Sequence, residues 1–131
     1  MKQHNENAIA VSNYLSNHPK IEKVFFPGTD KRHKEIAEKQ MDGFGGMMSF
    51  VIDSDINGVK TFLKNLNLFT LAESLGGVES LIEHPAIMTH ASIDPSIREK
   101  LGISETLLRI SVGIEDVDDL ISDLDQALSK I

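Results

Sequence analysis

The chain has 131 residues, 40% of them hydrophobic, and its 13 basic and 20 acidic residues give a formal charge of −7. This length fits one domain with a real core, and dispersed Lys and Arg in an acidic chain argue against a nucleic-acid-binding surface. The absence of cysteine excludes disulfides, thiolate metal sites and a cysteine nucleophile in this segment.

Targeting signals are the next feature to consider. No apolar run approaches the ~18–20 residues that a bilayer span needs, and residues 1–10 lack the plan of a signal peptide. We therefore expect a soluble, cytoplasmic chain without membrane contact.

The first half of the chain predicts alternating helices and strands. Residues 5–17 have the apolar spacing of an amphipathic helix, and its early start suggests a piece of something longer. "IEKVFFPG", residues 21–28, predicts a strand closed by a turn. "HKEIAEKQM", residues 33–41, predicts a short helix, and "MMSFVID", residues 47–53, a second strand.

A glycine-rich turn, "DGFGG" at residues 42–46, precedes the second strand. Glycines before an anion site let backbone amides approach a phosphate. These glycines lead into a strand instead of a helix, and no Lys-Ser/Thr follows. A plain turn is therefore favoured over phosphate binding.

The second half continues the alternation. "DINGVKTFLKNL", residues 55–66, predicts a helix capped by Asp55, and "LFTLA", residues 68–72, a third strand. "DPSIREKLG", residues 94–102, has a capping residue, a proline at the first helical position and a terminal glycine. "LLRISVG", residues 107–113, predicts a fourth strand.

The chain closes with an acidic amphipathic helix, expected from Asp116 to Lys130. The acidic run "EDVDDLISDLD", residues 115–125, is interpreted as a solvated helix face in preference to an interaction tail. Repeats, linkers and low-complexity segments are absent from the sequence. This order predicts an α/β fold, an α+β sandwich with a roughly four-stranded sheet covered by helices. The sheet should be mixed or mostly antiparallel, because several connections are too short for helical crossovers.

Arg109 is the first candidate functional residue. It interrupts the apolar strand, and strict alternation places it opposite the face of Leu108, Ile110 and Val112. A rigid strand therefore aims a fixed cation in one direction. Two readings remain open: a solvent-facing residue, or a carboxylate-binding one, to which a planar bidentate guanidinium is suited.

Glu73 and Ser74 form the second candidate, because they follow a strand where turns tend to carry function. The pair Gly76-Gly77 would let the chain bend or approach a ligand. Ser74 either takes part in an active site or merely caps "LGGVESLI", residues 75–82, as a helix.

Metal and hydrolase sites are not indicated. The five histidines show no HxH or HExxH spacing, so we expect no metal ion. A Gly-x-Ser-x-Gly elbow is also missing, and no Ser-His-Asp set can be chosen on physical grounds.

Two long segments carry a family resemblance: "LFTLAESLGGVESLIEHPAIMTHASI" and "LGISETLLRISVGIEDVDDLISDLDQAL". With "VFFPG" and "GFGGMMSF", they resemble the C-terminal domain of the Cys/Met-metabolism family of pyridoxal-phosphate enzymes, in the cystathionine γ-lyase and γ-synthase branch. The likeness covers nearly the whole chain in order. "PGTDKRHKEIA", residues 27–37, departs from it because it lacks the proline and the second histidine that are commonly seen in this surface turn of the family.

The resemblance implies that the cofactor machinery lies in a larger N-terminal domain absent from these 131 residues. That domain would supply the lysine that binds pyridoxal 5′-phosphate, the phosphate cradle and the tyrosine stacked on the cofactor ring. The only tyrosine here, Tyr14, lies in the first expected helix. The chain would then be a C-terminal domain, made separately or truncated, and inactive alone; the alternative is a stand-alone non-catalytic binding or regulatory module.

The resemblance also implies roles for four residues. Arg109 matches the arginine that binds the substrate α-carboxylate, and Ser74 matches the catalytic serine that helps to place the cofactor lysine for proton transfer. Glu73 matches the acidic residue at the distal end of the substrate site, and Thr89 lies in a segment that borders it.

The activity implied for the complete enzyme is that of a lyase or transferase acting at Cγ of an amino acid. The lyase outcome converts cystathionine to cysteine, 2-oxobutanoate and ammonia; the synthase outcome joins cysteine to an activated homoserine ester. The complete enzyme is expected to be a homotetramer.

Overall fold

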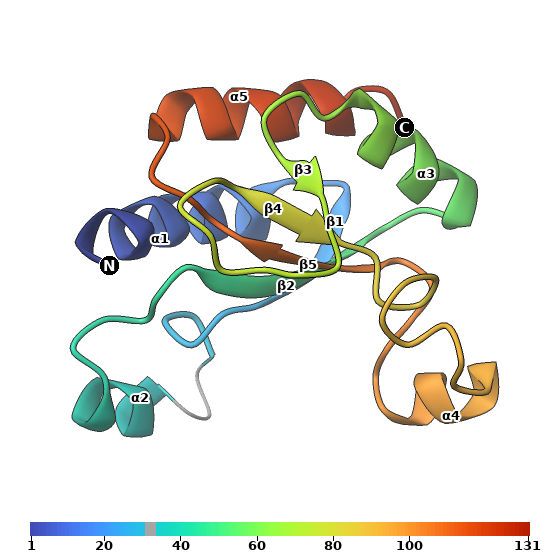
Figure 1. The fold of residues 1–131 in the computed structure, drawn as a ribbon, viewed down its shortest axis with the longest axis horizontal. Coiled ribbons are helices and arrows are strands. Elements are labelled where there is room, and N and C mark those ends of the chain that lie inside the picture. The colour runs from blue at the N-terminus through green and yellow to red at the C-terminus, as the bar shows by residue number, and fades with distance from the viewer. Residues whose placement is uncertain (31–33) are drawn as a thin grey trace.

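The computed structural model describes residues 1–30 and 34–131. Helices and strands alternate along the chain (Figure 1). In chain order they are α1 (Lys2–Asn17), β1 (Ile21–Phe25), α2 (Lys34–Gln40), β2 (Met47–Ile52), α3 (Ile56–Asn65), β3 (Thr70–Leu71), β4 (Leu81–Glu83), α4 (Pro95–Lys100), β5 (Leu107–Ser111) and α5 (Val117–Leu128). His33, the expected first residue of the second helix, and part of the turn at residues 27–37 lie outside the described residues.

The strands form one five-stranded mixed sheet in the order β1-β2-β5-β4-β3. Neighbours pair antiparallel except β3 and β4, which are parallel. The central strand β5 thus lies between β2 and β4, two strands that are distant from each other in sequence. The predicted α+β sandwich with a mixed sheet is confirmed, with one strand more than expected.

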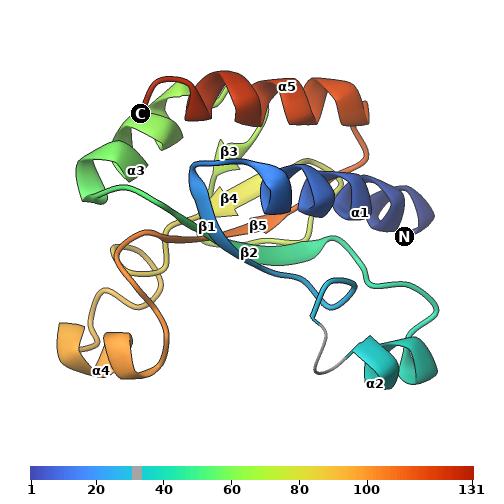
Figure 2. The same cartoon turned by 180° about the vertical axis from the view of Figure 1, so that it is seen from behind.

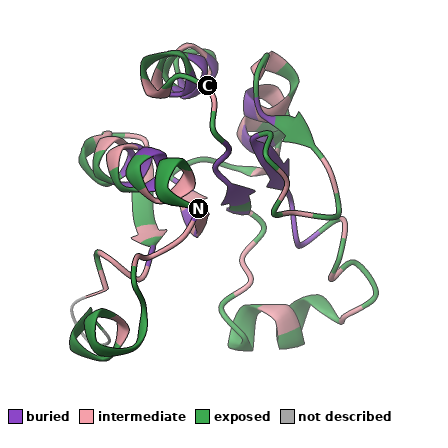
Figure 3. Cartoon of the chain, turned by 60° about the vertical axis from the view of Figure 1, so that its left-hand side comes forward, coloured by how far each residue is buried: buried purple, intermediate pink, exposed green. Residues whose placement is uncertain are grey.

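Helices α1, α3 and α5 lie on one side of the sheet in both views (Figures 1 and 2). The shorter helices α2 and α4 lie on the other side of the sheet, at opposite ends of the molecule. Neither α2 nor α4 has a buried residue, and Figure 3 shows the buried segments gathered in the strands and on the inner sides of the long helices. We call the sheet surface turned away from α1, α3 and α5 the open face.

The core fills the space between the sheet and the long helices. Alternate residues of β2 and β5 point into it, as the period of two requires, and every third or fourth residue of α1 and α5 meets them. Its fully buried members include Val11, Leu15, Phe50, Phe62, Leu108, Ile110, Leu120 and Leu124. The apolar face predicted for the strand around Arg109 is confirmed.

The helix starts follow the expected capping chemistry. The Asp55 carboxylate accepts a hydrogen bond from the Gly58 backbone N–H at 2.8 Å, and Asp94 accepts one from Ser96 at 2.9 Å. Each cap satisfies a backbone donor that the first helical turn leaves free. Both predicted caps are confirmed.

The region around β3 and β4 differs from expectation. The predicted strand at residues 68–72 is reduced to β3, because the backbone N–H groups of Leu68 and Phe69 donate to the Asp123 carboxylate at 2.8 and 3.2 Å. Asp123 is itself buried, so the acidic run is not uniformly a solvated face.

The segment 75–82 forms no helix, so the reading of Ser74 as a helix cap is wrong. Residues 73–80 form a bent loop without regular secondary structure that leads into the short strand β4. Gly76 has a φ of +99°, a backbone conformation that breaks helices and that only glycine adopts readily.

Candidate functional site

Arg109 lies at the centre of β5 and projects onto the open face. Its neighbours Leu108 and Ile110 are fully buried on the opposite face, whereas 51% of the Arg109 side chain is exposed. Alternation along the strand produces this difference. The guanidinium is therefore held by a central strand and still accessible to a ligand.

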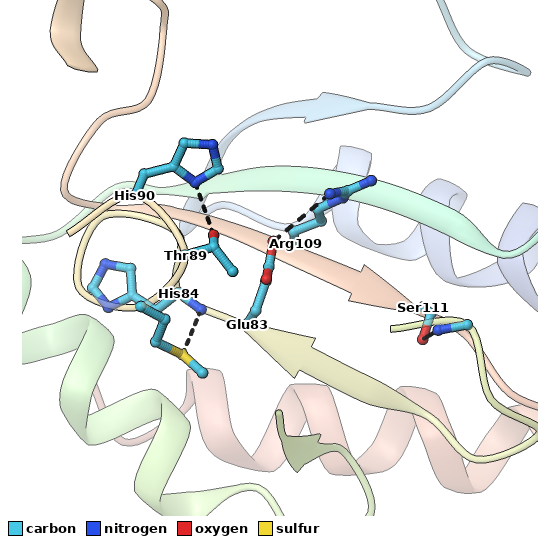
Figure 4. Close-up of polar contacts among 8 residues, drawn as sticks. Glu83, His84, Thr89, His90, Arg109 and Ser111 are labelled. Carbon is cyan, nitrogen blue, oxygen red and sulfur yellow. Dashed lines mark hydrogen bonds and ion pairs between the residues drawn. The ribbon is translucent and has the colours of Figure 1, made fainter. Parts of the chain in front are cut away.

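Glu83, at the end of β4, is the nearest charged partner of Arg109. The two residues are directly opposite in the antiparallel β4–β5 ladder, and Arg109 Nη1 lies 3.8 Å from Glu83 Oε1. Only 3% of the Glu83 side chain is exposed. Figure 4 shows the two side chains reaching toward each other across the strands.

Ser49 flanks Arg109 on the other side, since β2 pairs Ser49 with Arg109 in register. Strand pairing thus aligns Ser49, Arg109 and Glu83 in one row across three neighbouring strands. The row places one cation between a hydroxyl and a carboxylate. Arg109 is paired with Glu83 in this row, and half of its side chain remains exposed.

The loop that carries Glu73 and Ser74 is fastened to the same strand. The Gly76 backbone N–H donates to Ser111 Oγ at 3.0 Å, and Ser111 lies two residues from Arg109 on the same side of β5. Figure 1 shows this loop running along the open face between β3 and β4. Glu73 and Ser74 are exposed, so their side chains are free to face a ligand.

Thr89 lies in the turn that follows β4. It is exposed, and its hydroxyl lies 2.8 Å from Nδ1 of His90. Figure 4 shows this turn beyond the end of β4, on the same side as Arg109. The predicted residues thus come from β5, the loop before β4 and the turn after it.

His84 was not singled out from sequence, yet it is fully buried directly after Glu83. Its Nε2 lies 2.7 Å from the Glu105 carbonyl oxygen, so that nitrogen carries the proton and donates. Burial lowers the pKa of His84 below its ordinary value, although the Glu105 carbonyl acts in the opposite direction. Within the described residues, its Nδ1 has no hydrogen-bond partner.

Sequence reasoning also missed Glu83. Its strand is three residues long and buried throughout, so no alternation marks it. The sequence feature that could have identified it is a single glutamate in an apolar stretch, shortly before Pro85, a residue type that breaks helices. Only the cross-strand register reveals that this glutamate faces Arg109.

Two hollows bounded by described residues are lined by other side chains than these. One of about 580 Å³ lies between the start of α1 and residues 41–45, and another of about 400 Å³ lies between α4 and residues 103–105. Over residues 1–30 and 34–131, no group of three or more His, Asp or Glu side chains could hold a metal ion. In the same residues no helix has the length and hydropathy to cross a membrane.

The lysines test whether this chain could hold pyridoxal phosphate itself. Every lysine in the described part is exposed except Lys20. Lys20 donates to the backbone carbonyls of Leu128 and Ile131 at the end of α5. The lysines of the described part therefore show no site built for the cofactor.

Comparisons with known proteins agree on one family. A family model described as "Cys/Met metabolism PLP-dependent enzyme" matches residues 1–129. The cystathionine gamma-lyase of Dictyostelium discoideum is 53% identical over 131 residues and the cystathionine beta-lyase of Coxiella burnetii 54% over 129 residues; the matches cover 99% and 98% of this chain but 34% and 33% of those proteins.

Solved structures show the same relation. The cystathionine gamma synthase of Xanthomonas oryzae pv. oryzae, in complex with cystathionine, superposes with a TM-score of 0.93 at 46% identity, over 99% of this chain and 34% of that one. The chain thus spans about a third of the length of the relatives it matches. Since the match extends over nearly every residue here, the chain belongs to the Cys/Met-metabolism family of PLP-dependent enzymes.

Proposed function

We propose that the chain is the C-terminal domain of a trans-sulfuration enzyme, a cystathionine γ-lyase or cystathionine γ-synthase, and that it is inactive alone. The support is its family membership and its span of about a third of relatives with these activities in their names. The rest of the protein would bind pyridoxal phosphate, which supplies the electron-withdrawing chemistry at the substrate amino acid.

Arg109 is the residue on which the proposal mainly rests. A half-exposed guanidinium on a central strand offers two parallel N–H donors to a carboxylate. Every amino-acid substrate of such an enzyme, whether cystathionine, cysteine or a homoserine ester, carries an α-carboxylate. Arg109 would bind this group and fix the orientation of the reacting carbon.

The loop residues would complete the substrate side of the site. Ser74, held near β5 through Gly76 and Ser111, would help to place the cofactor-binding lysine of the other domain for proton transfer. Glu73 would face the distal end of the substrate, and Thr89 would border the pocket. Placing these groups within reach of one substrate is what the other domain would add.

Replacement of Arg109 in the complete enzyme tests the function. Arg109→Lys keeps the positive charge beside the buried Glu83 but loses the fork geometry, so kcat/KM for cystathionine should fall about tenfold. Arg109→Ala should reduce kcat/KM about ten- to hundredfold, because a charge-assisted carboxylate contact is worth ~1.5–3 kcal/mol.

Lys100→Ala serves as a control, because Lys100 is an exposed cation on α4. Its steady-state parameters should match those of the wild type. Thermal unfolding of each variant separates lost binding from lost folding. Unchanged kcat/KM in a folded Arg109→Lys enzyme would contradict the proposed role.

Two further properties are proposed for the complete protein on the basis of the family resemblance. It would be a homotetramer and would work in the cytoplasm. Analytical ultracentrifugation of the full-length enzyme and microscopy of a tagged full-length copy test these properties separately.

A further inference from the structure

The carboxylate of Glu83 is unusual among the ion pairs of the described residues. Lys2 and Glu6 lie 3.8 Å apart, the same separation as Arg109 and Glu83, but their side chains are 90% and 52% exposed. Exposed pairs of that kind contribute little and form at little cost. Glu83 is 3% exposed, so its charge has been removed from water.

A buried carboxylate is costly unless a cation or hydrogen-bond donors compensate it. Within the described residues, the Glu83 carboxylate pairs with Arg109. The pairing is enforced by the ladder, since Leu81 opposite Ser111 and Ile82 opposite Ile110 fix the same register. The ladder therefore keeps the backbone of Glu83 directly opposite that of Arg109.

Glu83 and Arg109 differ in how much of the side chain is exposed to solvent. The Glu83 side chain lies below the surface, whereas half of the Arg109 side chain remains accessible. The recorded contact engages Nη1 alone, so the remaining N–H groups of the guanidinium stay available. An arginine has several rotatable bonds, and a partner at one nitrogen removes much of its freedom before a ligand arrives.

We propose that Glu83 is the positioning residue for Arg109: it holds one nitrogen of the guanidinium from the neighbouring strand so that the outward edge is oriented to receive the substrate α-carboxylate. This inference rests on the proposed function of Arg109. Glu83 itself does not touch the substrate, and it acts by reducing the reorganisation that binding requires.

Glu83 can in principle also weaken substrate binding, and the experiment distinguishes this effect from positioning. A second carboxylate near the binding site repels the substrate carboxylate and partly neutralises Arg109. If repulsion dominated, removing the Glu83 charge would tighten substrate binding. If positioning dominates, as we propose, the same change weakens it.

The experiment uses the complete enzyme with cystathionine as substrate. Glu83→Gln keeps the side-chain shape and removes the charge; KM should rise about three- to tenfold while kcat stays within about twofold. Glu83→Asp keeps the charge but withdraws it by one methylene, and its KM should be intermediate. Glu22→Gln, an equal charge change on the exposed surface of β1, should leave both parameters unchanged.

Arg109→Lys and the double variant Arg109→Lys/Glu83→Gln complete the test. Because Glu83 acts through Arg109, Glu83→Gln should have little further effect on KM once Arg109 is a lysine. Additive effects would show that Glu83 acts by another route and would overturn the inference. An unchanged or lowered KM in folded Glu83→Gln enzyme would overturn it as well.

The outcomes separate this inference from the proposed function. If Arg109→Lys leaves KM unchanged, Arg109 does not bind the substrate and the proposed function fails. If Arg109→Lys raises KM and Glu83→Gln does not, only the positioning role fails. Should Glu83→Gln not fold, KM of Glu83→Asp gives the same decision.

Discussion

At the scale of single residues, His84, which directly follows β4, makes the stability of the fold depend on pH. It is fully buried, and burial lowers its pKa below the ordinary value of 6.5. The neutral ring is therefore the form that the folded state prefers. As the pH falls, His84 is protonated at a higher pH in the unfolded chain than in the folded chain. The free energy of unfolding therefore declines as the pH drops below about 6.5.

Substitution of His84 by glutamine should flatten this decline. Glutamine can still donate to the Glu105 carbonyl, but it does not titrate. We expect the difference in unfolding free energy between pH 7.5 and pH 5.5 to be smaller for His84→Gln than for the wild type, measured by urea denaturation of the same protein. An equal decline in both proteins would assign the acid sensitivity to other groups.

At the scale of elements, Asp123 joins α5 to the chain that enters β3. Its carboxylate accepts hydrogen bonds from the backbone N–H groups of Asn67, Leu68 and Phe69 at 2.8, 2.8 and 3.2 Å. Burial alone would raise the pKa of Asp123, but these bonds outweigh it and the pKa is lowered. The stabilisation is therefore present at neutral pH and is lost as the pH falls through the folded-state pKa.

Asp123→Asn should destabilise the chain by about 2–3 kcal/mol, because an amide cannot accept all of these bonds and its NH₂ group faces other donors. Urea denaturation at pH 7 measures the change. Asp118→Asn, an equal charge change on the exposed side of α5, should cost less than about 1 kcal/mol. Similar losses in both variants would mean that net charge, and not the bonds to residues 67–69, is responsible.

At the scale of the whole molecule, the sheet is covered by long helices on one side only. The open face carries Arg109 and the loop with Ser74, and it is the surface that we propose to lie against the cofactor-binding domain. Interfaces between domains of one chain are of moderate size and partly polar. The isolated chain should therefore remain folded, as a monomer or a weakly self-associating species.

The isolated chain should also fail to hold the cofactor. The lysines of the described part are exposed or, for Lys20, engaged by the end of α5. Addition of pyridoxal phosphate followed by borohydride should give no stoichiometric adduct at a single lysine by mass spectrometry, and cystathionine should not be consumed. A molten, ANS-binding state would contradict the folding part of this prediction, and a single modified lysine would contradict the rest.

The features that depend on neighbouring residues could be predicted from the amino-acid sequence. The period of two placed Arg109 opposite Leu108 and Ile110, and the capping residues Asp55 and Asp94 marked where helices begin. These are effects of backbone geometry over a few residues, and they do not depend on which distant segments pack together. Strand alternation singled out Arg109, and the turn after a predicted strand singled out Glu73 and Ser74. The family resemblance added Thr89 and the roles of all four residues, which stay predictions.

Which strands are neighbours in the sheet could not be predicted from the sequence and follows from the fold. The order β1-β2-β5-β4-β3 joins segments far apart in the chain and brings Glu83 opposite Arg109. The packing of α5 in the same fold brings Asp123 to the residues before β3. The strands β3 and β4 are too short to carry a periodic signal, so packing and cross-chain hydrogen bonds define them. Long-range pairing depends on the free energy of the entire core, which no local pattern contains.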